Sequence, residues 1–150
     1  MAPFKKILCP TDLSEPSYKA IEKANALAAL CSADLFILQV IPSVTILPGA
    51  TVDPAAKGSA PQDRSFALLE RSLGALIEER ISKGLRVHPM VLTGSDAAER
   101  IIRFADEEGI DLIVIASHGQ SGWKRLLFGS VTEKVLKHAS CSVLLIQAPH

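Results

Sequence analysis

Short runs of apolar residues alternate along this chain with segments whose apolar residues recur every three or four positions. Each run is bounded by turn-forming residues and lacks the apolar–polar alternation of a sheet with one solvated face. Continuously apolar runs are typical of strands in a parallel sheet that is covered on both faces. We therefore predict five buried strands, at residues 7–9, 35–41, 87–92, 112–116 and 143–146.

Three of the intervening segments carry an apolar stripe at helical spacing, which predicts amphipathic helices packed against the sheet. The fourth helix is expected to follow residue 129. The stripes consist of Ala20, Ile21, Ala24, Leu27, Ala28 and Cys31, then Phe66, Leu69, Leu73, Leu76 and Ile77, then Ala98, Ile101, Ile102 and Ala105.

Polar residues and glycines indicate where these helices begin and end. Ser14 precedes the first helix, and the segments 96–99 and 130–133 have the pattern of a capping box, in which two side chains satisfy first-turn N–H groups. Gly84 and Gly109 follow the second and third helices and are their expected stops.

The order of the predicted elements indicates a topology. Strands that alternate with helices imply right-handed crossovers and a doubly wound α/β fold with a five-stranded parallel sheet. Pro89 cannot donate a ladder hydrogen bond, so its strand belongs at a sheet edge, which fits strand order 3-2-1-4-5. The 150 residues are expected to form one domain, 1–150. The proline-rich stretch 42–61 breaks the pattern and predicts a flexible loop.

Composition excludes several classes of function. Lys and Arg number 16, as do Asp and Glu, so the net charge is zero and a basic nucleic-acid-binding surface is excluded at the whole-chain level. No apolar run approaches the roughly 18 residues of a membrane span, and nothing favours docking on an anionic membrane. The apolar stretch near the N-terminus is too short for a signal peptide, so we expect a cytoplasmic protein. A mean hydropathy of +0.27 requires apolar residues to be hidden in buried strands or against another chain.

The three cysteines give no sign of chemistry. Cys9, Cys31 and Cys141 form no C-x-x-C pair and no metal-ligand spacing. We interpret them as small core residues of a protein in a reducing compartment, and we predict no metal site.

A ligand site is expected where the strand order reverses. In open parallel sheets, ligands bind at the carboxyl ends of the strands beside that point. Here the first strand ends at Pro10, Thr11 and Asp12, and the fourth ends at Ala116. Neither G-x-G-x-x-G nor G-x-x-x-x-G-K-[ST] follows the first strand. No nucleophile–base pair or carboxylate cluster for Mg²⁺ is visible, so no catalytic residue is predicted.

A glycine-bearing loop follows the fourth strand and ends in Gly129 and Ser130 at the start of the last helix. Glycine lets the backbone approach a phosphate, and a helix N-terminus offers unpaired N–H groups to it. Ser130 either donates its hydroxyl to a phosphate or simply caps the helix. His118 either contacts a phosphate or ribose or is an exposed loop residue. Asp12 is either a ligand contact or a turn-forming residue.

The segment Ala116-x2-Gly119-x9-Gly129-Ser130 resembles the nucleotide motif of the universal stress protein family, G-x2-G-x9-G-[ST], with alanine at the first glycine. The segments 10–14, 111–114 and 142–145 also resemble that family, so the resemblance covers nearly the whole chain. It implies a flavodoxin-like, adenine-nucleotide α-hydrolase-like fold and a homodimer. It also implies binding of ATP, or of ADP or AMP, with or without Mg²⁺.

The resemblance also implies roles for single residues. Asp12 would hold the ribose or adenine side of the nucleotide, and Val40 would contact adenine. If Ala116 has ordinary backbone angles its methyl group costs little, whereas a required positive φ would cost about 1 kcal/mol or more. The remaining members of the expected nucleotide site are Pro10, Thr11, His118, Gly119, Gly129, Ser130, Val131 and Thr132.

The last strand is uncharged and is expected at an open sheet edge, which a monomer normally protects with charge. We therefore predict a homodimer. It would act as a stress-response module in which the bound nucleotide changes a surface that a protein partner recognises. Two alternatives remain open: a nucleotide-independent dimeric signalling module, and a slow ATPase or autophosphorylating enzyme with Ser130 or Thr132 as acceptor. The predicted dimer interface consists of Ser142, Val143, Leu144, Leu145 and Ile146.

Overall fold

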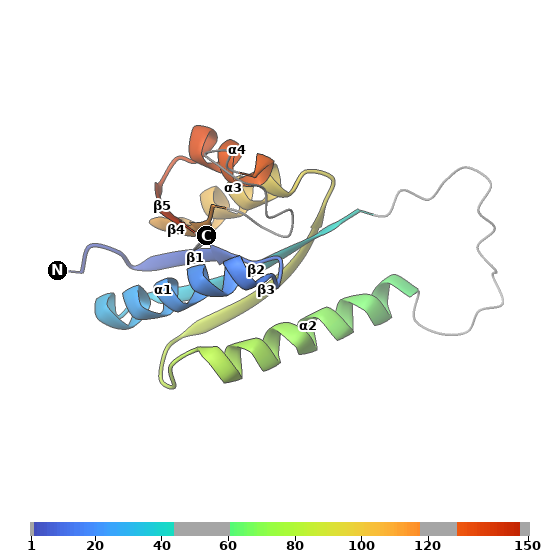
Figure 1. The fold of residues 1–150 in the computed structure, drawn as a ribbon, viewed down its shortest axis with the longest axis horizontal. Coiled ribbons are helices and arrows are strands. Elements are labelled where there is room, and N and C mark those ends of the chain that lie inside the picture. Colours follow the sequence, from blue (N-terminus) through green and yellow to red (C-terminus); the bar gives the residue numbers. More distant parts are fainter. Residues whose placement is uncertain (1, 44–60, 118–128, 148–150) are drawn as a thin grey trace.

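The computed structural model describes residues 2–43, 61–117 and 129–147, with the backbone alone for 61–65. Five parallel strands form one sheet in the order β3-β2-β1-β4-β5, which confirms the predicted topology (Figure 1). The elements are β1 (Lys6–Pro10), α1 (Glu15–Cys31), β2 (Asp34–Pro42), α2 (Pro61–Arg80), β3 (Val87–Gly94), α3 (Ala97–Glu108), β4 (Leu112–Ala116), α4 (Ser130–His138) and β5 (Ser142–Ile146).

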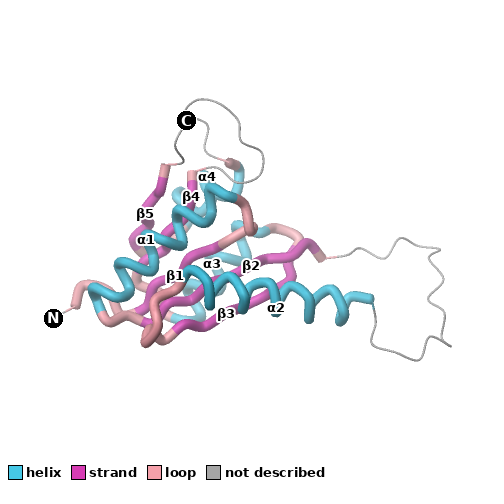
Figure 2. The backbone as a smooth tube through the Cα atoms, turned by 60° about the horizontal axis from the view of Figure 1, so that its bottom comes forward, coloured by secondary structure: helices cyan, strands magenta, loops and turns pink. Residues whose placement is uncertain are grey.

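Helices cover both faces of the sheet, because alternate side chains of each strand point to opposite faces. Helices α1 and α2 pack on one face, with Leu35 and Ile37 of β2 beneath them. Helices α3 and α4 pack on the other, where Leu38 of the same strand is buried. The long helix α2 runs alongside β2 and β3 (Figure 2). The three predicted helical stripes all lie within these two clusters.

Strands β1 and β4 are largely buried, β2 is buried over residues 35–38, and the edge strands β3 and β5 are mostly half-buried or exposed. Every residue of β4 is buried, and so is β1 apart from Lys6. The prediction of five fully buried strands is wrong for β3, where Val91 is the buried residue, and for β5, which has none. Each of these strands lies at an edge of the sheet, where fewer neighbours cover it.

The register of β3 explains how it accepts a proline. Leu35 of β2 donates its N–H group to the carbonyl of Arg86 at 2.9 Å, and Ser43, just after β2, donates to the carbonyl of Gly94 at 3.2 Å. The residue pairing between β2 and β3 keeps the same register from one of these bonds to the other. Even-numbered residues of β3 therefore direct their backbone groups toward β2. Pro89 is an odd-numbered residue, so its nitrogen points away from β2 toward the open edge of the sheet. Its missing N–H group thus removes no hydrogen bond from the ladder.

Most predicted helix ends are confirmed. Ser14 and Asp96 accept N–H groups of the first turns of α1 and α3. Gly109 ends α3 with a left-handed φ of 65°. Gly84 does not end α2, since that helix stops at Arg80 and Gly84 lies in the following turn at φ 93°.

The remaining expectations have mixed outcomes. Residues 44–60 of the predicted loop lie outside the described residues, and its end residues Pro42 and Pro61 belong to β2 and α2. Cys9 and Cys31 are buried, whereas Cys141 is half-buried, and all three are free thiols. Within the described ranges, no helix has the length and apolar character needed to cross a membrane.

Candidate functional site

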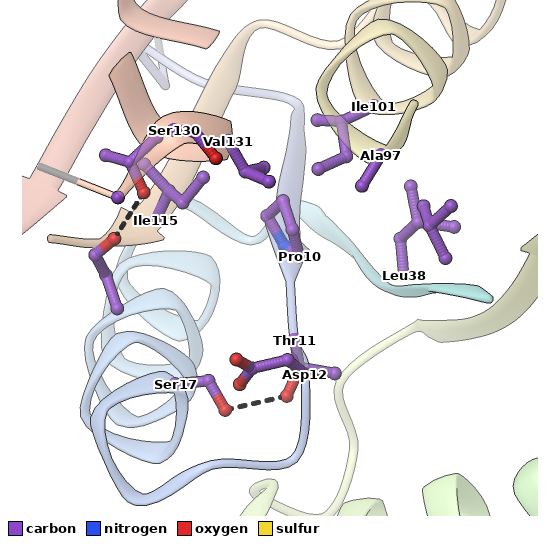
Figure 3. Close-up of a pocket in the computed structure, with 14 residues that line it drawn as sticks. Pro10, Thr11, Asp12, Ser17, Leu38, Ala97, Ile101, Ile115, Ser130 and Val131 are labelled. Carbon is purple, nitrogen blue, oxygen red and sulfur yellow. Dashed lines mark hydrogen bonds between the residues drawn. The ribbon is translucent and has the colours of Figure 1, made fainter. Parts of the chain in front are cut away.

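A pocket of 360 Å³ opens at the carboxyl ends of β1, β2 and β4, where the strand order reverses (Figure 3). Its volume falls within the range of about 300–1,000 Å³ that is common for small-molecule sites. Every predicted nucleotide-site residue that the structure describes lines it, whereas His118 and Gly119 lie outside the described residues. The predicted residues in the lining are Pro10, Thr11, Asp12, Val40, Ala116, Gly129, Ser130, Val131 and Thr132.

Five further lining residues were not predicted. Leu38, Ala97, Ile101 and Ile115 bring apolar side chains from β2, α3 and β4, and Ser17 brings a hydroxyl from α1. Figure 3 shows Leu38, Ala97 and Ile101 on one side of the pocket. The sequence contained one signal for Leu38. Residues two apart on a strand share a face, so Leu38 lies on the same face of the sheet as the predicted site residue Val40. The apolar side suits a flat hydrophobic group.

The turn after β1 is a tightly hydrogen-bonded segment that places Asp12 at the pocket. Of the two interpretations of Asp12, the turn-forming one is present. Its Oδ1 accepts the Ser14 N–H group at 3.0 Å and also the Ser14 hydroxyl. Leu13 has a left-handed φ of 62°, which costs about 1–2 kcal/mol for a residue with a side chain. The Leu13 N–H group donates to Thr11 Oγ1 at 3.0 Å, and its side chain packs against the core, which together hold this conformation.

Helix α4 begins without a side-chain cap. Gly129 occupies the cap position, and Ser130 is the first helical residue. The prediction that 130–133 is a capping box is therefore wrong, because Ser130 lies one position beyond the place from which a hydroxyl caps. Helix starts carry unpaired N–H groups and a partial positive charge, and here residues 130–132 of that first turn line the pocket.

Three hydrogen bonds fix the start of α4 to the ends of the neighbouring strands. Thr132 Oγ1 donates to the carbonyl of Ala116 at 2.9 Å, and both residues are buried. The Gly129 N–H group donates to the carbonyl of Ser117 at 3.1 Å. Ser117 in turn donates its N–H group to the carbonyl of Ile146, at the end of β5, at 2.8 Å. The pocket wall formed by α4 is thus held in a defined place.

An ion pair joins the helices on either side of the pocket. Lys134 of α4 donates to the carboxylate of Asp96, which caps α3. This hydrogen bond lowers the pKa of Asp96 and raises the pKa of Lys134. Both effects favour the charged forms that make the contact.

Ala116 has an ordinary backbone conformation. It is the last residue of β4, and the described non-glycine residues with positive φ are Leu13 and Ser32. The cost of about 1 kcal/mol or more that a positive φ would impose on alanine therefore does not apply at this position.

The described lining carries few of the side chains that take part in acid–base or nucleophilic chemistry. It contains no lysine, arginine, histidine or cysteine, and Asp12 is its charged residue. Nearby, burial raises the pKa of the Cys9 thiol, which keeps it from acting as a thiolate. Across the parts of the chain that the structure describes, no group of three His, Cys, Asp or Glu side chains could hold a metal ion.

Comparison with known proteins gives a consistent relationship. The model of the universal stress protein family matches residues 3–147. Universal stress protein MJ0531 of Methanocaldococcus jannaschii is 32% identical, over 97% of this chain and 84% of its own. MJ0577 from the same organism is 31% identical, over 96% and 95% of the two chains. Its solved structure has a TM-score of 0.71 at 27% identity and 98% coverage of both chains.

One further solved structure of similar fold contains a nucleotide. The universal stress protein from Archaeoglobus fulgidus, solved in complex with dAMP, has a TM-score of 0.63 at 20% identity and covers 97% of this chain and 99% of its own. At this identity the likeness establishes the shared fold.

Proposed function

This chain belongs to the universal stress protein family, and from that premise we propose that it binds an adenine nucleotide in the pocket at the ends of β1, β2 and β4. The observation that carries the proposal is the uncapped start of α4. The first turn of this helix, whose N–H groups lack a side-chain cap, lines a pocket whose other side is apolar.

The phosphates would lie at the start of α4. Unpaired N–H groups and the positive end of the helix dipole bind anions without any cationic side chain. Ser130 is exposed and is not used as the cap, so its hydroxyl is available to donate. When ATP is the ligand, Mg²⁺ would be bound mainly through the phosphates.

The base would lie against the apolar side. Val40 and Ala97 are half-buried and offer a hydrophobic surface to a flat ring, and the buried side chains of Leu38 and Ile101 complete the apolar lining. The dAMP complex of the Archaeoglobus relative supports a purine nucleotide as the class of ligand. In the cell, occupancy would change the surface that a protein partner recognises during stress.

Isothermal titration calorimetry with ATP, AMP and adenosine tests the proposal. We expect ATP and AMP to bind more tightly than adenosine, because a phosphate adds the contacts at α4. The absence of heat with all three at millimolar concentration would contradict nucleotide binding, provided that a known ATP-binding protein gives a clear signal under the same conditions.

Replacing Ala116 by glycine is expected to change nucleotide affinity by less than about twofold, well under the tenfold that 1.4 kcal/mol represents. The reason is that Ala116 has ordinary backbone angles and is already accommodated in β4. The same calorimetric titration measures the effect. A strong gain of binding in Ala116→Gly would instead favour a natural protein that signals without a nucleotide.

We also propose that two copies of the chain pair through β5. This strand lies at an open edge of the sheet, and Leu144 on it is 38% exposed. Leu144→Lys is expected to shift the protein from dimer to monomer, because a charge at a strand edge opposes pairing. Light scattering at micromolar concentration gives the mass. Leu136→Lys on α4, at a leucine of 37% exposure, is the matched control and should remain dimeric.

A further inference from the structure

We propose that Thr11 and Ser17 determine ligand specificity, because their hydroxyls can accept hydrogen bonds from a ligand but cannot donate to it. The inference rests on the proposed nucleotide site, whose lining includes both residues. It assigns to Ser17, which sequence reasoning missed, a role beyond support of the turn.

The positions of the hydroxyl protons follow from the hydrogen bonds. Ser17 Oγ lies 2.7 Å from the carbonyl oxygen of Ser14, which can only accept, so the single Ser17 proton is committed there. Thr11 Oγ1 lies 2.9 Å from Ser17 Oγ, and one of the two must donate. Since the Ser17 proton is already used, Thr11 donates to Ser17. Thr11 Oγ1 itself accepts the Leu13 N–H group at 3.0 Å.

This chain of hydrogen bonds leaves lone pairs and no protons. A hydroxyl has one proton and two acceptor lone pairs. In Thr11 and in Ser17 the proton and one lone pair are used within the turn, and one lone pair remains on each oxygen. Both side chains are more than nine-tenths buried, at 6% and 4% exposure, so bulk water does not readily reorder them.

The pocket therefore has two polar ends of opposite character. Figure 3 shows Thr11, Asp12 and Ser17 together at one end and Ser130 with Val131 at another. The first end offers the acceptor lone pairs of Thr11 and Ser17, whereas the start of α4 offers N–H donors. Thr132 does not change this pattern, because its proton is donated to Ala116. A ligand that carries donors at one end and an anion at the other is bound in one orientation.

A nucleotide has two kinds of group that satisfy the acceptor end: the exocyclic amino group of adenine and the hydroxyls of ribose. Both donate hydrogen bonds, and two pairs of ligands distinguish them. AMP and inosine monophosphate differ in the amino group, which is a carbonyl acceptor in the latter. AMP and its 2′-deoxy and 3′-deoxy analogues differ in the sugar hydroxyls.

The first experiment measures the affinity of the natural protein for these ligands. In at least one of these pairs, we expect AMP to bind about three- to tenfold more tightly than the analogue that lacks the donor. This ratio corresponds to the contribution of one net hydrogen bond. A preference over inosine monophosphate identifies the amino group, and a preference over a deoxy analogue identifies the sugar.

The decisive variant is Ser17→Ala. It removes the acceptor of the Thr11 proton, so Thr11 becomes able to donate into the pocket. We expect the preference for the donor-bearing ligand to fall by about threefold or more, with inosine monophosphate or the deoxy analogue gaining relative affinity. Thr11→Val removes the hydroxyl at nearly constant shape. This variant should weaken the preference for the donor-bearing ligand without raising the relative affinity for inosine monophosphate or the deoxy analogue.

Ser82→Ala is the matched control. Ser82 Oγ accepts a hydrogen bond from Asn25 Nδ2 at 3.1 Å, away from the pocket, so this variant loses a hydroxyl contact while the preference should stay unchanged. Thermal unfolding of each variant checks that it is folded. A merely structural role of Ser17 would lower the melting temperature or the affinity for all ligands equally, and would leave the ratio of affinities as it was.

The outcomes separate this inference from the proposed function. If the natural protein binds none of the nucleotides, the proposed function fails. If it binds AMP without preference in any pair, or if Ser17→Ala keeps the ratio of affinities within error, nucleotide binding stands and the specificity role of Thr11 and Ser17 is overturned.

Discussion

Replacing Gly129 with valine is expected to lower the affinity for ATP or AMP by about tenfold or more, a loss of at least 1.4 kcal/mol of binding free energy. Gly129 lines the pocket at the start of α4, where the phosphates are proposed to bind. A branched side chain there occupies the space that an anion needs in order to reach the first-turn N–H groups. Calorimetric titration with both nucleotides gives the change.

The same substitution should leave the fold intact. The φ angle of Gly129 is −55°, which any residue adopts, and a Cβ atom built there meets no described atom within 4 Å. Since valine is a poor cap residue, the expected loss of stability is up to about 1 kcal/mol. Gly74→Val in α2 is the control, because Gly74 also has open space around it and lies outside the pocket lining. Natural affinity in Gly129→Val would contradict the placement of phosphates at α4.

Replacing Ile113 with alanine is expected to lower the free energy of unfolding by about 3 kcal/mol, within the range of 2–5 kcal/mol that such core truncations cost. Ile113 is the second residue of β4, is 0% exposed and belongs to the cluster beneath α3 and α4. Strand β4 has neighbours on both sides, so its backbone cannot move to close the cavity. A loss of this size is a large part of the 5–15 kcal/mol that is usual for a domain.

Urea denaturation with an unchanged m-value measures this difference. Ile102→Ala is the comparison, because it deletes the same atoms from a half-buried residue of α3 that packs against the same cluster. We expect it to cost about 1 kcal/mol, in line with the smaller apolar area that it removes from burial. Equal losses at the two positions would show that β4 is not the rigid centre of the sheet.

The parts of the fold that depend on burial were predictable from sequence, because burial on both faces leaves a run of apolar residues. This pattern revealed β1 and β4, and Pro89 marked an edge. The edge strands were overestimated, since β5 has the same apolar composition as a buried strand although one side of it has no neighbour. The apolar composition of a strand does not reveal how many neighbouring elements cover it, because that number depends on the topology of the sheet.

The pocket was predictable where polar residues follow strands and was missed where it is apolar. Ile101 fits the helical stripe of α3, and periodicity does not distinguish a side chain that faces the core from one that faces a cavity. The start of α4 was misassigned for a related reason. Serine at 130 with glutamate at 133 matches a capping pattern, but the preceding Gly129 also accepts the cap position, and local sequence does not choose between them.

The outward register of Pro89 limits how many chains can join through their sheets. A sheet with two open edges can add a neighbour at each and grow into a filament. Here one edge has a proline within β3, whose nitrogen lies on the side that a further strand would need, and the other edge is β5. If two chains pair through β5 as proposed, the interface occupies the proline-free edge of both partners, and the assembly would close at two chains without polymerising.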